Sequence, residues 1–140
     1  MQIGTKFSIA IHILLSAEVF KETHKVTSDF IASSANTNPV IIRNIMGMLK
    51  EAGIIEVAAG TGGITLTRKP KDISLKDIYL AIDPVKDGRL FKIHQNTEPN
   101  CPVGGNIERI LNPYFFKAQN AMENELGKYN LKNLLDDLKQ

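Results

Sequence analysis

The chain has 140 residues, of which 43% are apolar and 23% charged, a composition typical of one globular domain and not of a disordered chain. A net charge of +2 permits nucleic-acid binding but does not require it. A single cysteine excludes an internal disulfide, and the apolar stretch Phe7 to Leu15 is far shorter than a membrane span of about 20 residues. We therefore expect a soluble, cytoplasmic protein without a targeting segment.

Apolar residues near the start of the chain recur at the spacing of one helix face, which predicts a helix from about Thr5. The stripe is Phe7, Ala10, Ile11 and Leu14, with further apolar residues beside it at Ile9, Ile13 and Val19. This helix is either the central core helix or one with a flank against another subunit. His12 within it is accordingly a hydrogen-bonded core or interface residue.

A short helix, a turn and a third helix are expected next. Thr27 suits the N-cap of the short helix, and Asn36 tolerates the left-handed conformation that ends it. The third helix is expected from Pro39 to about Ala52, with Gly53 after its end. Its predicted buried stripe is Ile42, Ile45, Met46 and Leu49, and its opposite face carries Val40, Arg43, Asn44, Gly47 and Lys50.

Two short segments rich in β-branched residues, 54–57 and 64–67, flank a glycine-rich turn, and the second alternates apolar and polar residues. Together they predict a β-hairpin. A fourth helix is expected to open at Ser74 with a capping box and to end at Asp83-Pro84. Residues 85–105 show little pattern, although Leu90 to His94 permits a short extended piece.

The last third of the chain is expected to be helical from Ile107, with Asn112-Pro113 interrupting or restarting the pattern. A final short helix is expected after Asn130. A long helix so far from the first core in sequence needs a partner to bury it. Its candidate dimer-interface residues are Tyr114, Phe115, Ala118, Met122 and Leu126.

The order of helix, turn, helix and hairpin is the most informative feature, because it is the winged form of the helix-turn-helix. Arg43 suits a guanine edge, Asn44 an adenine edge and Val40 a thymine methyl. The alternative is an ordinary solvated helix face. The candidate DNA-binding residues are Thr37, Asn38, Val40, Arg43, Asn44, Gly47, Lys50, Thr61, Gly62 and Arg68, with Lys69 and Lys71 adding positive charge near the last of them.

The sequence contains no motif typical of an enzyme active site. The glycine-rich turn at 60–63 lacks the Lys-Ser/Thr ending of a phosphate loop, and no serine stands in a nucleophile elbow. The three histidines lack the spacing of metal ligands, so we expect no catalytic or metal site.

The sequence resembles the Rrf2 family of winged-helix transcription regulators over about its whole length. The matching segments are 5–10, 26–32, 38–43, 49–55, 60–63 and 73–79, and residues 112–126 are similar to the family's long dimerisation helix. The resemblance implies a homodimer that binds a near-palindromic operator and usually represses.

The resemblance also implies a possible sensor, because some members hold an iron–sulfur cluster with three cysteines. This chain has Cys101 there, with Ile107 and Ile110 at the positions six and nine residues later, so we expect no cluster and no other cofactor. Cys101 lies just before a helix start, where a thiol can be reactive. It is either an oxidant sensor or an incidental small residue.

The expected fold is mostly α with a small β-hairpin wing: a winged helix-turn-helix plus a long C-terminal dimerisation helix. The expected regions are a DNA-binding domain over 1–84, a variable sensor region over 85–105 and a helical dimerisation region over 106–140. Two alternatives to an oxidant-responsive repressor stay open. One is a regulator that binds a small molecule near Tyr79, Phe91 and Tyr114, and the other is a winged-helix module that binds protein. The sequence does not define the operator, the effector or the choice between repression and activation.

Overall fold

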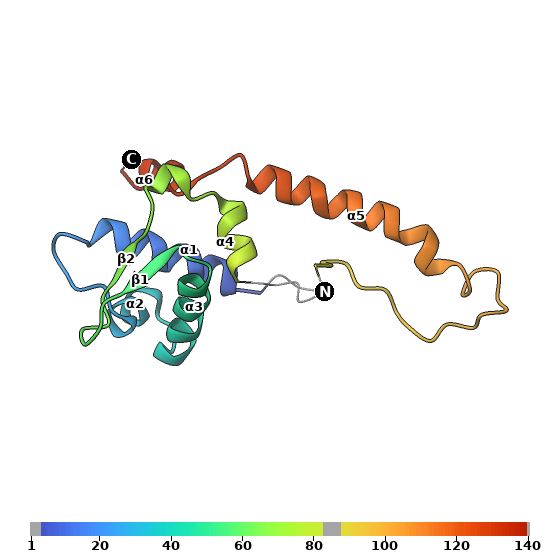
Figure 1. Ribbon diagram of the computed structural model, residues 1–140, viewed down its shortest axis with the longest axis horizontal. Helices are drawn as coiled ribbons and strands as arrows, with labels where there is room; N and C mark the ends of the chain where they lie inside the picture. Colours follow the sequence, from blue (N-terminus) through green and yellow to red (C-terminus); the bar gives the residue numbers. More distant parts are fainter. Residues whose placement is uncertain (1–3, 83–87, 140) are drawn as a thin grey trace.

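The computed structural model describes residues 4–82 and 88–139, which form a head of short helices with a hairpin and one long helix that projects from it (Figure 1). The elements in chain order are α1 (Lys6–Val19), α2 (Ser28–Ala35), α3 (Pro39–Glu51), β1 (Ile55–Val57), β2 (Ile64–Leu66), the 3₁₀ turn η1 (Pro70–Asp72), α4 (Leu75–Ala81), α5 (Ile107–Leu126) and α6 (Leu131–Leu138). This is the winged helix-turn-helix order that the sequence predicts. Asp83-Pro84, the expected end of the fourth helix, lies outside the described residues.

Local capping interactions set the boundaries of the helix-turn-helix. The side chain of Thr27 accepts a hydrogen bond from the Phe30 N–H at 3.2 Å, and Asn38 Oδ1 accepts one from the Val40 N–H at 2.8 Å. Asn36 follows α2 with φ 51° and ψ 49°, the left-handed conformation that asparagine tolerates. The predicted caps and turn are therefore confirmed.

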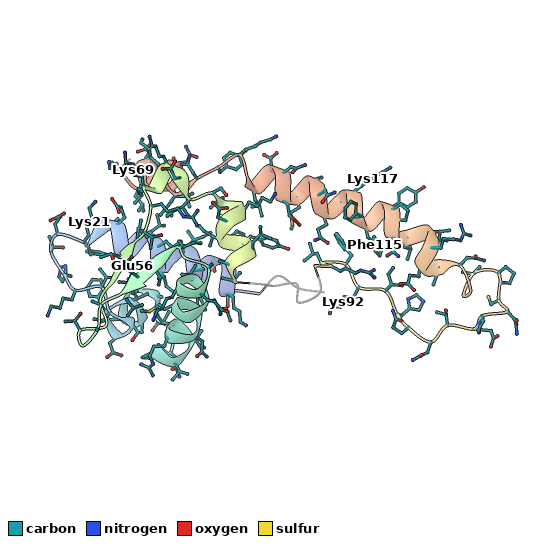
Figure 2. The ribbon with its side chains drawn as sticks, in the orientation of Figure 1. Lys21, Glu56, Lys69, Lys92, Phe115 and Lys117 are labelled. Carbon is teal, nitrogen blue, oxygen red and sulfur yellow. The ribbon has the colours of Figure 1, made fainter. Side chains whose placement is uncertain are left out.

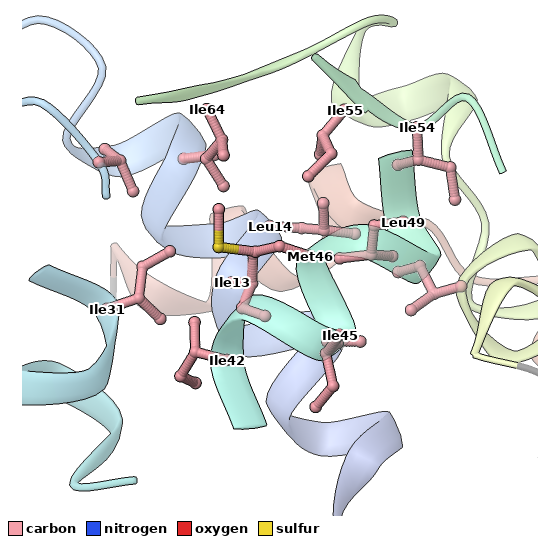
Figure 3. Packing of buried hydrophobic residues seen from close by; sticks show 14 of the residues in the cluster. Ile13, Leu14, Ile31, Ile42, Ile45, Met46, Leu49, Ile54, Ile55 and Ile64 are labelled. Carbon is pink, nitrogen blue, oxygen red and sulfur yellow. The ribbon is translucent and has the colours of Figure 1, made fainter. Parts of the chain in front are cut away.

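The core of the head is built around α1, which contacts α2, α3, α4, α6 and β2. Figure 3 shows Ile13 and Leu14 of α1 packed among apolar side chains of α2, α3 and the hairpin. All four residues of the stripe predicted on α3 are buried: Ile42, Ile45, Met46 and Leu49. Burying a side chain of this size stabilises a fold by about 1.5–3 kcal/mol, so this stripe holds α3 firmly in the head.

The hairpin pairs β1 with β2 in antiparallel register, with Glu56 opposite Thr65. Ile64 N–H donates to Val26 O at 3.0 Å, which ties the hairpin to the chain before α2, and Thr67 N–H donates to Ile54 O at 3.0 Å, which closes its base. Gly60 and Gly62 at the tip have φ of 85° and 73°, where glycine avoids the strain of a Cβ atom. The hairpin is thus a short wing fixed to the head at its base.

The helix α4 begins with the predicted capping box, in which Ser74 and Asp77 each accept a hydrogen bond from the other's backbone N–H at 3.0 Å. The last helix returns to the same place, because Leu75 N–H donates to Tyr129 O and Leu131 N–H to Ile73 O, each at 2.9 Å. Residues 131–138 thus pack with the head, although they follow the long helix in the chain.

The long helix α5 runs from Ile107 to Leu126 without a break, and no residue in it is buried. The expectation that Asn112-Pro113 would interrupt or restart the helix is wrong. Pro113 lies in the second turn of α5, where its ring costs one backbone hydrogen bond but does not end the helix. Within the described residues, no helix is long and apolar enough to cross a membrane.

The segment that precedes α5 folds back beside it (Figure 1). Gln119 of α5 holds this segment at two points: its Oε1 accepts from Leu90 N–H, and its Nε2 donates to Gly88 O, both at 2.8 Å. Residues 90–94 form no strand in the structure. The segment is therefore fixed by side-chain and loop contacts and not by a β-ladder.

Candidate nucleic-acid interface

The face of α3 that points away from the core is exposed along its length. Arg43, Asn44 and Lys50 are all exposed, and within the described part of the chain no hydrogen bond or ion pair engages their side chains. An arginine fork suits a guanine edge, and an asparagine amide suits an adenine edge. These three side chains are therefore free to contact an external ligand.

The middle of this face is small and partly apolar. At about 100° per residue, Val40, Asn44 and Gly47 lie along its centre. A Cβ atom on Gly47 would meet nothing within 4 Å, so the fold itself does not require glycine there. Ile41, to which the sequence analysis gave no role, is 44% exposed at the edge of the face. The signal that identifies Ile41 is its helical position beside, and not within, the buried stripe.

Thr37 and Asn38, the two candidate DNA contacts in the turn, make hydrogen bonds within the fold. Thr37 N–H donates to Ala32 O, and the Thr37 hydroxyl donates to Ala35 O, each at 3.1 Å. The Oδ1 atom of Asn38 is engaged by its cap on α3, and the residue is exposed. Thr37 and Asn38 thus position α3, and the side-chain amide nitrogen of Asn38 is the group best placed for an outside contact.

The tip of the wing is small and uncharged. Ala58 N–H donates to Gly63 O at 2.9 Å, and Gly62 N–H donates to Ala58 O at 3.0 Å, so these bonds close the turn. Thr61 is exposed at the tip, with its hydroxyl oxygen 3.4 Å from the Gly63 nitrogen. Because residues 58–63 contain no bulky side chain, the wing backbone can approach a flat or grooved surface closely.

The basic residues that follow the wing make contacts away from the exposed face of α3. Arg68 lies 3.5 Å from Asp77 at the start of α4, so part of its charge is compensated within the fold. In Figure 2, Lys69 lies beside η1 and α6, at the opposite end of the head from α3. Lys69 and Lys71 instead border a surface depression with Lys132 and Asp136.

The long helix exposes large aromatic side chains. Tyr114 is 70% and Phe116 is 66% exposed, and the sequence analysis missed Phe116. Phe115 is half-buried against Phe91 of the preceding segment, with ring centroids 5.2 Å apart. Of the other predicted interface residues, Ala118 is exposed and Met122 and Leu126 are half-buried.

A pocket of about 340 Å³ lies between the segment before α5 and the helix, where Phe91, Pro113 and Phe115 line it. The expected grouping of Tyr79, Phe91 and Tyr114 around one pocket is wrong in two of its members. Tyr79 is buried in the head, 5.7 Å from the ring of Phe7, and Tyr114 does not line the pocket.

Cys101 lies in a tight loop before α5. Its sulfur is 3.4 Å from the Gly104 nitrogen, and this hydrogen bond, with a second from the Val103 N–H, lowers the pKa of the thiol below its ordinary value. Gly105 N–H donates to Cys101 O at 2.8 Å. A Cβ atom on Gly105 would lie 2.5 Å from Pro99 O, so this loop requires glycine there. The residue is half-buried, and both hydrogen bonds stabilise the thiolate form.

This architecture is found in a family of known proteins. Residues 3–137 match the Rrf2 family, described as "Iron-dependent Transcriptional regulator". The chain is 40% identical over 136 residues to YwnA of Bacillus subtilis, described as an HTH-type transcriptional regulator, and the match covers 97% of this chain and 98% of YwnA. The chain belongs to the Rrf2 family.

Solved structures agree with the Rrf2 fold. A structure described as a transcriptional regulator from Lactobacillus plantarum aligns with a TM-score of 0.80 at 28% identity, covering 97% of this chain and 91% of that one. CymR of B. subtilis, described as the global cysteine regulator, aligns with a TM-score of 0.67 at 19% identity, covering 96% and 95%. The Rrf2 family and these relatives are transcriptional regulators, not enzymes.

The iron in the Rrf2 family description does not fit the donor groups of this chain. An iron–sulfur cluster needs about four ligands, mostly thiolates, and the sequence has one cysteine. Among the residues that the structure describes, no three His, Cys, Asp or Glu side chains gather to hold a metal ion. His12 is half-buried with its Nε2 atom 2.9 Å from Ser34 Oγ, a contact between α1 and α2. The donor groups of the described residues therefore do not fit a bound iron or an iron–sulfur cluster.

Proposed function

We propose that this chain acts in the cytoplasm as a homodimeric repressor that binds a near-palindromic DNA operator through α3 and the wing. The observation that carries the proposal is the exposed face of α3, where Arg43, Asn44 and Lys50 have no partner within the described part of the chain. The candidate contacts are those predicted from the sequence. Among them, Thr37 acts mainly as a positioning residue, and Arg68 also forms an ion pair with Asp77.

A second copy explains the surface of α5. A 20-residue helix with no buried residue gains little stability from the head, and its exposed aromatic residues favour contact with an apolar surface. Pairing of two such helices through the face that carries Tyr114 and Ala118 covers exposed apolar surface and places two heads at a fixed separation. Two heads on a twofold axis read two half-sites about 34–36 Å apart or a multiple of that distance.

The DNA-binding function is tested by titrating the full-length protein against a random duplex at several salt concentrations. We expect affinity to fall steeply as salt rises, because binding to phosphates releases counterions. Selection from random DNA is then expected to yield near-palindromic sites. A protein that binds no duplex at low salt would instead be a winged-helix module for protein partners, the alternative that the sequence leaves open.

Repression is tested in cells with a reporter gene whose promoter contains the selected site. We expect reporter output to fall when the protein is supplied, because a dimer bound across a promoter blocks polymerase access. The Arg43→Ala variant serves as the control, since it removes the base contact and leaves the fold unchanged. A rise in reporter output would identify an activator and contradict this part of the proposal.

Control by oxidants through Cys101 is part of the proposal. The lowered pKa of the thiol supports it, because the thiolate is the form that attacks peroxide or hypochlorite. Attack on peroxide gives a sulfenic acid and releases hydroxide, and a second thiol from outside the chain converts the sulfenic acid to a mixed disulfide with loss of water. The loop leads directly into α5, so a change there can alter the angle between the two heads. Oxidant is expected to weaken operator binding by the wild type and to leave Cys101→Ser unaffected. An equal response in both proteins would remove Cys101 from the mechanism.

A small-molecule effector is the second candidate, and the pocket beside Phe91 and Phe115 favours it. In that case Cys101 is incidental. Phe91→Ala is expected to abolish the response to such an effector and to leave operator binding in its absence unchanged. The test is a thermal-shift screen of small molecules with both proteins.

A further inference from the structure

The exposed face of α3 is apolar at its N-terminal end. Val40 and Ile41 are the second and third residues of the helix, and they are 52% and 44% exposed. Among the described residues they are the large apolar side chains that stand exposed on the helix-turn-helix. In proteins of this class, the N-terminal residues of the recognition helix contact base edges.

Within the described part of the chain, these two side chains keep about half of their surface in solvent. Both lie outside the buried stripe of α3, where β-branched residues have a lower helix propensity than alanine. Apolar surface in water gains free energy only when another apolar surface covers it. Their presence at the start of α3 therefore points to an apolar group on the ligand of this helix.

Base edges in the major groove offer one such group, the 5-methyl of thymine. We propose that α3 selects operator half-sites by contact of Val40 and Ile41 with thymine methyl groups. The inference rests on the proposed DNA-binding function and adds the class of sequence that is bound.

The lack of a side chain at Gly47 supports close approach of α3 to the base edges. Valine is a short side chain, so it reaches a base edge only if the helix lies close to the groove. Gly47 lies two turns after Val40 on the same face, and the space around its Cα is open. A helix without a side chain at this point can approach the DNA more closely than one with a larger residue there.

The test replaces each thymine of a selected operator in turn by deoxyuridine, which removes only the methyl group. Affinity of the full-length protein is measured by fluorescence anisotropy at one salt concentration. We expect one or two thymines in each half-site to show a loss of about fourfold, the effect of one methyl-sized group leaving an apolar contact. Other thymines are expected to show no loss.

Two variants identify the side chains responsible. Val40→Ser and Ile41→Ser remove every methyl group of the side chain, and each is expected to lose sensitivity to uracil at its own position. Val103→Ser is the matched control, because Val103 is 65% exposed in the loop before α5 and the variant is expected to keep the full uracil effect. Thermal melting confirms that all three fold.

Equal binding of thymine and uracil duplexes by the wild type would overturn the proposal while leaving DNA binding intact. An unchanged uracil effect in both α3 variants would overturn it as well. Failure to bind the thymine duplex itself would overturn the DNA-binding function, and the proposal with it.

Discussion

At the level of single residues, a substitution on the exposed face of α3 can change fold stability and DNA binding in opposite directions. Gly47 lies inside a helix with helical backbone angles and open space around it, where alanine is favoured by about 0.5–1 kcal/mol. We expect Gly47→Ala to raise the free energy of unfolding by about that amount and to weaken operator binding. Urea unfolding and anisotropy measure the two effects, and a variant that gains stability without losing affinity would show that DNA does not approach Gly47.

Arg43 and Lys50 lie on the same face but are expected to contribute differently. Arg43→Ala should weaken specific binding by about 1–3 kcal/mol and change the selected sequence, because it removes a contact to a base edge. Lys50→Ala should weaken binding to all sequences alike and reduce the slope of the salt dependence by about one, because it removes a phosphate contact. Site selection and salt titration of both variants distinguish these roles, and an unchanged selected sequence for Arg43→Ala would show that this face is not the reader.

At the scale of elements, α4 begins at a capping box that also lies where the chain returns from α5. Ser74→Ala removes the hydroxyl that accepts from the Asp77 N–H and should lower the free energy of unfolding by about 1 kcal/mol. Ser33→Ala is the matched control, since Ser33 is exposed in α2 and an alanine there should change stability little. Equal stability of the two variants, measured by urea unfolding, would show that the box contributes nothing.

The elements that sequence reasoning predicts correctly are those set by neighbouring residues. Thr27, Asn38 and Ser74 act through hydrogen bonds that span two or three residues, so their pattern is visible in the sequence. The position of α6 on the head is different, because it depends on contacts of Leu131 with residues far away in the chain. Pro113 shows the same limit, since a proline penalty within a helix is outweighed by the turns on both sides of it.

The candidate site follows the same division. The exposed positions of Arg43 and Asn44 follow from helical periodicity alone. The separation of Lys69 from α3 does not, because it depends on the path of the chain after β2. The packing of Phe115 on Phe91, with Tyr114 left in solvent, likewise depends on how residues 88–106 fold back along α5.

At the level of the whole molecule, the proposed function requires two copies of the chain joined through α5. We expect the wild type to sediment as a dimer at micromolar concentration and Tyr114→Glu to shift toward monomer, because a charge in an apolar interface is costly. Glu108→Gln, at an exposed position on the same helix, is the control and should remain dimeric. A monomeric wild type would contradict the account of α5.

In the proposed complex, two identical heads read two half-sites at a separation fixed by the dimer. The most direct measurement is the affinity for a selected operator compared with the same operator after insertion of five base pairs between its half-sites. Five base pairs turn one half-site by about half a helical turn, so only one head can still reach its sequence. We expect a loss of about a hundredfold or more, toward non-specific binding. An affinity that changes less than about twofold would contradict it.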